Sequence, residues 1–174
     1  MKKKYIAIIL IIIGFLVIIE VIFFQKGIQE KKAQQEALMG TLIKALSNKH
    51  FKQGTKITYN SNPPSSGAHY PDPQHAGVYT KTPLDGNLVH SLEHGAIIIW
   101  YNPKKLSKEQ TKTLTNIFTS IRLQKKIMTP RDTMPTAVAL TSWGRLLPLK
   151  MLDEKQIRAF FKMNYDKGPE QASI

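Results

Sequence analysis

The sequence predicts an α+β fold, in which helices pack on a small mixed β-sheet and an N-terminal transmembrane helix precedes the domain. Three observations indicate this fold. An apolar run covers residues 6–24, a second apolar stretch of strand length covers residues 96–101, and amphipathic helical patterns alternate with strand patterns after it. The predicted core order, after a long loop region, is β-α-β-β-α, which is typical of helices packed on a mixed sheet.

The first apolar run follows three lysines and contains one charged residue, Glu20. A helix over it would be about 28 Å long, close to the roughly 30 Å hydrocarbon core of a bilayer. The exit "VIFFQKG" lacks a small-residue cleavage pattern, so we expect an uncleaved signal anchor. The lysines predict a single-pass cell-membrane protein with its C-terminal domain outside the cytoplasm, although Lys26, Lys31 and Lys32 leave the opposite orientation open.

Three segments follow from this pattern: 1–25 with the cytoplasmic lysines and the anchor, 26–50 as a helical stalk, and 51–174 as the extracytoplasmic domain. The stalk is predicted because its residues are mostly good helix formers. Apolar residues recur there at helical spacing. These residues are Leu38, Leu42, Ala45 and Leu46.

Residues 50–87 are loop-rich, and they hold five of the ten prolines in the chain. A short strand is predicted at 56–59. Such a long irregular segment is unusual in a small domain unless it has a function or wraps a surface. We therefore expect functional residues in this segment.

The stretch "AIIIWY", residues 96–101, is continuously apolar, as expected of a central strand. Asn102 and Pro103 end it. Ser107 and Gln110 form a capping-box pattern, which predicts the start of an amphipathic helix over 108–125.

Two further strand patterns follow at 125–130 and 136–149, with a turn at Arg131-Asp132 between them. Asp153 is predicted to open the last helix, and Gly168 to end it. These elements complete the predicted core.

The composition narrows the function classes. The net charge of +13 suggests nucleic acid as a partner, but the lysines are spread along the chain and do not cluster with aromatic residues. We therefore expect no nucleic acid, and expect contact with membrane lipid through the N-terminal helix. The chain has no cysteine, which excludes disulfides and thiolate metal ligands.

Two histidines, His90 and His94, lie four residues apart before the central strand. In a strand, this spacing would separate them by roughly 13 Å, too far for one ion. In a helical turn they share a face and can chelate. Gly95 follows at once and can end such a turn, so the sequence predicts a short helix here.

A third ligand candidate is His69, which lies in the proline-stiffened stretch "NPPSSGAHYPD". Three histidines are a common way to hold zinc or copper with an open fourth position. Met134 is a possible axial ligand that would favour copper, and His75 is a weaker fourth candidate. His50 is interpreted as a surface residue.

Glu93 lies between the two paired histidines and admits several roles. As a hydrogen-bond partner it would fix a histidine tautomer in a metal-handling module, whose partner would be a metal donor or acceptor protein. In an H-x-x-E-H zinc hydrolase, residues 90–94 would form the site and Glu93 would be the catalytic base. In a domain for binding or assembly, the same side chains would only hold the long loop to the sheet.

Three motifs together resemble the DUF3105 family of uncharacterised bacterial proteins: "YNSNPPSSGAHYP", "LVHSLEHGAIIIWYNP" and "VALTSWGRL". The resemblance covers about residues 55–170, with the motifs in the expected order. Family members usually have Pro and Ala where this chain has Ala68 and Ser142. The resemblance implies a similar domain, often behind a membrane anchor, and no established activity.

Overall fold

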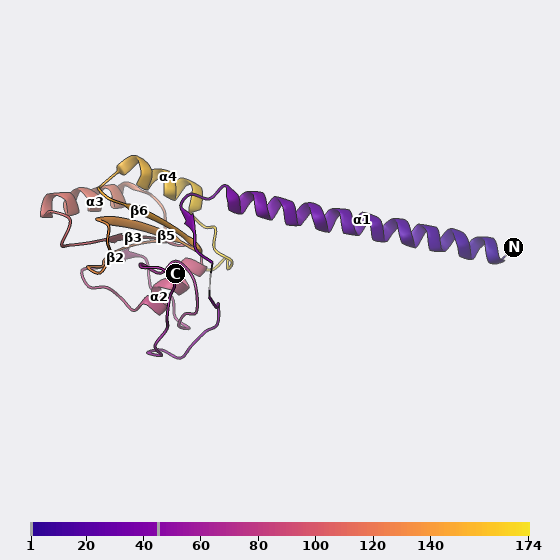
Figure 1. The fold of residues 1–174 in the computed structure, drawn as a ribbon, viewed down its shortest axis with the longest axis horizontal. Helices are drawn as coiled ribbons and strands as arrows, with labels where there is room; N and C mark the ends of the chain where they lie inside the picture. Colours follow the sequence, from indigo (N-terminus) through magenta and orange to yellow (C-terminus); the bar gives the residue numbers. More distant parts are fainter. Residues whose placement is uncertain (1, 45) are drawn as a thin grey trace. The chain divides into compact units, whose positions relative to one another are not determined.

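The structure is a computed structural model that describes the backbone of residues 2–44 and 46–174. Side chains are described for these residues except 2–4, 6–11, 31, 32 and 34–36. The chain divides into two compact units, residues 1–38 and residues 39–174 (Figure 1). The second unit is an α+β domain with three helices and a six-stranded mixed sheet, which confirms the predicted fold class.

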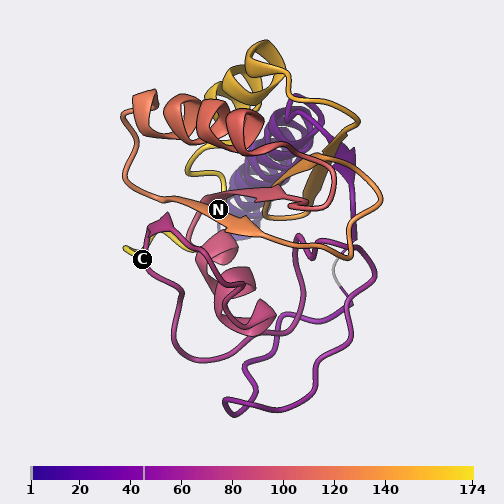
Figure 2. The ribbon, with the colours of Figure 1, turned by 90° about the vertical axis from the view of Figure 1, so that its left-hand side faces the viewer.

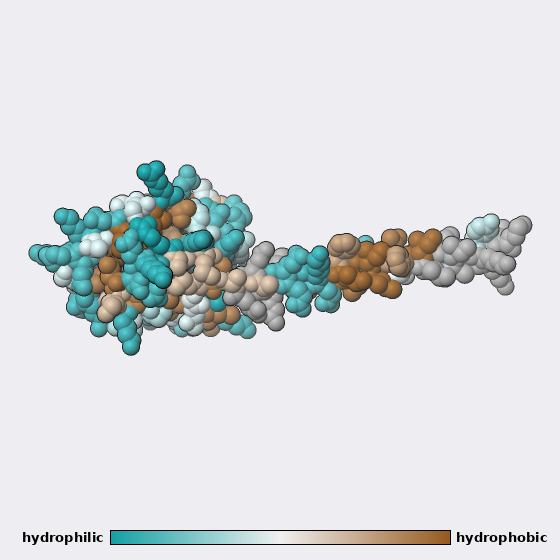
Figure 3. Space-filling model, turned by 90° about the horizontal axis from the view of Figure 1, so that it is seen from above, coloured by the Kyte–Doolittle hydropathy of each residue, from teal (hydrophilic) through white to brown (hydrophobic). Residues whose placement is uncertain are grey.

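The first unit is built on one helix, α1 (Lys2–Glu36). Its 19-residue stretch Ile12–Glu30 has a mean hydropathy of 1.8 and is long and apolar enough to cross a membrane. The exposed apolar side chains of this stretch form the brown band of the helix in Figure 3. The helix could therefore anchor the protein in a membrane.

The predicted helical stalk over 26–50 was wrong in its second half. Helix α1 ends at Glu36, and Thr41–Leu42 form strand β1, which pairs antiparallel with β6. Of the predicted apolar stripe, Ala45 lies outside the described residues. Tertiary pairing with the sheet outweighs the intrinsic helix propensity of this segment, which is only a weak preference.

The sheet has the strand order β1-β6-β5-β3-β4-β2. Strand β3 is parallel to β4 and antiparallel to β5, and the remaining neighbours β5–β6 and β1–β6 are antiparallel. The short β2 adds to β4 in parallel. The bounds of the elements beyond β1 are β2 Gly77–Val78, α2 Asp85–Glu93, β3 Ile97–Tyr101, α3 Lys108–Ser120, β4 Lys126–Pro130, β5 Val138–Ser142, β6 Arg145–Leu149 and α4 Glu154–Asn164.

Helices α3 and α4 cover one face of the sheet, and α2 lies on the other (Figure 2). Under α3 and α4, the larger apolar cluster joins Leu114 and Phe160 to sheet residues such as Ile99. Under α2, the smaller cluster joins Leu92 to Ile98 and to other sheet residues. Strand β3 is buried on both faces, which is the physical reason for its continuous apolar run.

The local predictions hold only in part, and the stretch 136–149, predicted as one strand, forms the two strands β5 and β6. Ser107 caps α3 in a capping box with Gln110, and Asp153 caps α4. Helix α3 ends at Ser120 instead of 125, and residues 56–59 form no strand. Gly168 does not end α4, which stops at Asn164; its role is described below.

A buried side chain, Asn164, helps to hold the entry of the chain into the domain. Its Nδ2 donates to the Met39 carbonyl at 2.9 Å and to Ser142 Oγ at 2.9 Å, and its Oδ1 accepts from the Met39 amide at 2.9 Å. All three bonds link segments far apart in sequence, so this residue ties the start of the domain to the end of α4.

We expect Asn164→Ala to lower the free energy of unfolding by about 2–3 kcal/mol, because it leaves the half-buried backbone groups of Met39 and the buried Ser142 hydroxyl without this partner. Urea unfolding of the full chain in detergent, followed by tryptophan fluorescence, measures this. Asn116→Ala is the matched control, since Asn116 is exposed on α3 and should cost less than about 0.5 kcal/mol. Equal costs for the two variants would contradict the anchoring role of Asn164.

Candidate functional site

Helix α2 positions the paired histidines as predicted. It covers Asp85–Glu93, and Gly95, at φ +85°, turns the chain toward β3. Leu88 and Leu92 pack one side of the helix into the core, which leaves His90 and His94 on another side. Their Nε2 atoms lie 3.0 Å apart, so the i, i+4 spacing does bring the two imidazoles together.

The third histidine comes from a buried loop. Residues 63–70 are all buried, although they form no helix or long strand. The loop is paired with the segment before it: the His69 amide donates to the Lys49 carbonyl at 3.1 Å, and the Phe51 amide donates to the His69 carbonyl at 2.8 Å. This parallel bridge sets His50 beside His69, with Nε2 atoms 3.1 Å apart.

Backbone carbonyls fix the tautomers of three of these rings. The Nδ1 atoms of His69, His90 and His94 lie 2.9, 2.7 and 2.8 Å from the carbonyl oxygens of Gly67, Tyr70 and Ser173. A carbonyl oxygen only accepts, so each Nδ1 must carry a hydrogen. In the neutral rings, every Nε2 then presents a lone pair, which is the arrangement found in metal-bound histidines.

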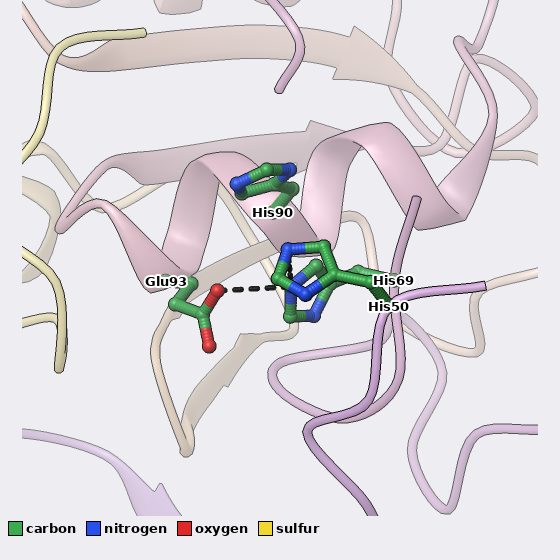
Figure 4. Close-up of side chains that lie close together, drawn as sticks. All are labelled: His50, His69, His90 and Glu93. Atoms are coloured by element: carbon green, nitrogen blue, oxygen red, sulfur yellow. Dashed lines mark hydrogen bonds and ion pairs between the residues drawn. The ribbon is translucent and has the colours of Figure 1, made fainter. Parts of the chain in front are cut away.

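Four side chains form what we call the inner group, defined as His50, His69, His90 and Glu93 (Figure 4). One ligand atom from each lies within 4.8 Å of those of the others. The Glu93 Oε2 atom lies 2.9 Å from His69 Nε2, is buried, and has no hydrogen-bond partner among the described residues. When the His69 ring is neutral, its Nε2 lone pair faces the Glu93 carboxylate, and a proton or a cation between the two atoms would relieve that contact.

Burial shapes the charges of the inner group. It lowers the pKa of His90, against the opposing effect of the hydrogen bond that the ring donates to the Tyr70 carbonyl, and so favours the neutral ring. Burial also raises the pKa of the Glu93 carboxyl, which the nearby His69 partly offsets. Burial therefore favours a neutral His90 ring, and a bound cation would offset the cost of a negative charge on Glu93.

A second set, which we call the outer group, is defined as His90, His94 and Glu170. Glu170 Oε2 lies 3.4 Å from His94 Nε2, and its side chain is 53% exposed. His90 belongs to both groups. Among the described residues, His69 and His94 therefore lie in different ligand groups, and the predicted trio His69, His90 and His94 is not a single set.

The remaining candidates lie elsewhere. Met134 is buried in the apolar cluster under α2 with Leu92, and its role as an axial ligand has no support in this packing. His75 is exposed, and its carbonyl accepts from the Tyr79 hydroxyl at 2.7 Å. It belongs to neither of the two groups found among the described residues.

Sequence reasoning missed His50 and Glu170. His50 is exposed as interpreted, yet its imidazole joins the inner group. The parallel bridge that brings it to His69 joins two irregular segments, and no local pattern marks it. Glu170 lies in the C-terminal tail, and the sequence marks it only as an acidic residue after the last helix, which does not predict its contact with His94.

Residues 50–174 match the family described as "Protein of unknown function (DUF3105)". The match covers the whole inner and outer groups and all of the sheet except β1. Searches of curated proteins and of solved structures find no match. The family description assigns no activity, so the chemistry of the side chains is the basis for a functional conclusion.

Proposed function

This chain belongs to the DUF3105 family, and from its side-chain chemistry we propose that its domain binds a transition-metal ion. The ligands are the inner group: the Nε2 atoms of His50, His69 and His90 and the carboxylate of Glu93. Three imidazoles and one carboxylate form a common ligand set for such ions.

The observation that supports this proposal is the buried contact between His69 and Glu93. With the His69 ring neutral and the Glu93 carboxyl ionised, His69 Nε2 and Glu93 Oε2 are both acceptors, yet they lie 2.9 Å apart. His69 Nε2 also faces His50 Nε2 at 3.1 Å, and one proton cannot satisfy both contacts. In a tetrahedral zinc site with bonds of about 2.0–2.1 Å, ligand atoms lie roughly 3.3–3.4 Å apart. The separations of 2.9 and 3.1 Å are shorter than that value, by no more than about half an ångström.

The donor set favours a divalent ion such as Zn²⁺ or Cu²⁺ over Cu⁺. Imidazole suits both ions, whereas Cu⁺ prefers thiolate and thioether sulfur. The chain has no cysteine, and the buried Met134 packs with apolar side chains. The carboxylate of Glu93 further favours a divalent ion over a soft monovalent one.

The residues around the ligands hold them in place. The carbonyls of Gly67 and Tyr70 accept from His69 and His90, which orients both rings. Gly67 has φ +132°, a conformation that glycine adopts readily, and this lets its carbonyl face the His69 ring. Such partners raise ligand basicity and reduce the entropy that binding must overcome.

The location is part of the same proposal. Helix α1 is apolar enough to sit in a membrane, and the lysines at its start favour a cytoplasmic N-terminus. The domain then lies outside the cytoplasm, where a metal donor or acceptor protein could exchange the ion with it. The H-x-x-E-H hydrolase gains less support, because Glu93 and His94 fall in different groups.

We expect the full chain, purified in detergent without a polyhistidine tag, to bind about one equivalent of Zn²⁺ or Cu²⁺. The ion should be measured by elemental analysis after loading with each metal and gel filtration. Chelator treatment should remove it, and thermal unfolding should then occur at a lower temperature, because the ion stabilises only the folded state. Less than about a tenth of an equivalent with both metals would overturn the proposal.

A further inference from the structure

The outer group places a second set of metal-type donors beside the inner one. His90 Nε2 lies 3.0 Å from His94 Nε2, and Glu170 Oε2 lies 3.4 Å from the same His94 atom. The Nδ1 atom of His94 faces the Ser173 carbonyl, so its Nε2 presents a lone pair toward His90. No part of the inner site requires these contacts.

His90 has only one nitrogen to offer, because its Nδ1 donates to the Tyr70 carbonyl at 2.7 Å. A lone pair on one nitrogen binds one ion. The inner and outer groups therefore compete for His90 Nε2. An ion bound to this atom takes its other ligands from the inner group or from the outer group, but not from both.

The two groups also differ in their access to solvent. The side chains of His69 and Glu93 are 0% and 6% exposed, whereas that of Glu170 is 53% exposed. Glu170 belongs to the C-terminal tail, whose backbone is fixed to α2 by the bond from the Glu170 amide to the Glu93 carbonyl at 3.1 Å. The tail thus carries a carboxylate to the solvent side of His90.

We propose that His94 and Glu170 form an outer subsite through which a metal ion reaches and leaves the inner site, with His90 as the shared ligand. The ion keeps its bond to His90 Nε2 while bonds to His94 and Glu170 are exchanged for bonds to His50, His69 and Glu93. The inference rests on the metal binding proposed above. The ligand class is the same, Zn²⁺ or Cu²⁺, and no change of oxidation state is involved.

The test uses Zn²⁺ as the probe and the full chain in detergent, and it compares wild type with His94→Ala and Glu170→Gln. For His94→Ala we expect the equilibrium affinity to stay within about threefold and release to a coloured chelator to slow at least about tenfold. For Glu170→Gln, which keeps the size and the backbone contacts of an exposed residue, we expect release to slow about threefold. Glu154→Gln is the control, since it removes an exposed carboxylate from α4, outside both groups.

Saturation at one equivalent of Zn²⁺ is expected, because the shared nitrogen serves one ion. Binding of two equivalents of Zn²⁺ with similar affinity would contradict the proposal that the two groups share His90. Release rates equal to wild type in both variants would overturn the route, and a loss of affinity in His94→Ala as large as that in His69→Ala would make His94 an inner ligand instead. These results concern the outer subsite alone, whereas a wild-type chain that binds no metal would refute the proposed function itself.

Discussion

Replacement of His69 by alanine is expected to lower the affinity of the protein for Zn²⁺ by at least roughly 100-fold. Loss of residues that merely orient ligands already costs about 10- to 100-fold in other sites, and His69 is proposed as a ligand itself. His69 is fully buried, and its Nε2 atom lies 3.1 Å from His50 Nε2 and 2.9 Å from Glu93 Oε2. Removal of His69 therefore takes away the ligand that lies next to both His50 and Glu93.

The matched control is His75→Ala, which removes the same side chain from an exposed position. Its affinity should equal that of wild type when both are measured by competition with a chromophoric chelator. Circular dichroism of both variants confirms that each is folded. An equal loss in both, or an undiminished affinity in folded His69→Ala, would contradict the proposed ligand set.

The part of this site that the sequence predicts is the part made by local geometry. The spacing of His90 and His94, followed by Gly95, predicts one turn of helix with both rings on one side, and α2 has that form. His69 could be singled out because it lies in a long, proline-stiffened loop, and such a loop in a small domain suggests a function. Periodicity and turn chemistry act over a few residues, so they suffice for such features.

The part that could not be predicted depends on pairing between distant segments. His50 reaches the inner group only because its segment runs parallel to the segment of His69, and Glu170 reaches His94 only because the tail folds back over the end of α2. The stalk prediction failed for the same reason. Thr41 and Leu42 pair with backbone groups of β6. This pairing outweighs the helical spacing of apolar residues on which the stalk prediction was based.

Gly168→Ala is expected to lower the free energy of unfolding by about 3 kcal/mol. A Cβ atom there would overlap the Glu93 carbonyl oxygen and the Gly95 nitrogen. Both are backbone atoms at the end of α2, so neither can rotate away. The tail must move instead, at a cost typical of overpacking plus lost hydrogen bonds.

The bonds at risk are those that fasten the tail to the site. They run from the Asp166 amide to the Gly95 carbonyl at 2.9 Å and from the Glu170 amide to the Glu93 carbonyl at 3.1 Å. We therefore expect urea unfolding of Gly168→Ala at a lower midpoint than wild type, and zinc release slowed about threefold, as in Glu170→Gln, because Glu170 is displaced. Inner-site affinity should fall less than tenfold, since none of its ligands lies in the tail.

Lys167→Ala is the control, as Lys167 is exposed and adjacent, and its cost should stay below about 0.5 kcal/mol. A Gly168→Ala variant as stable as this control would mean that the tail does not rest on the end of α2 in solution. The glycine predicted to stop a helix is thus better explained by the close approach of two backbones. That approach brings the C-terminal tail to the end of α2 and its Glu170 carboxylate to His94.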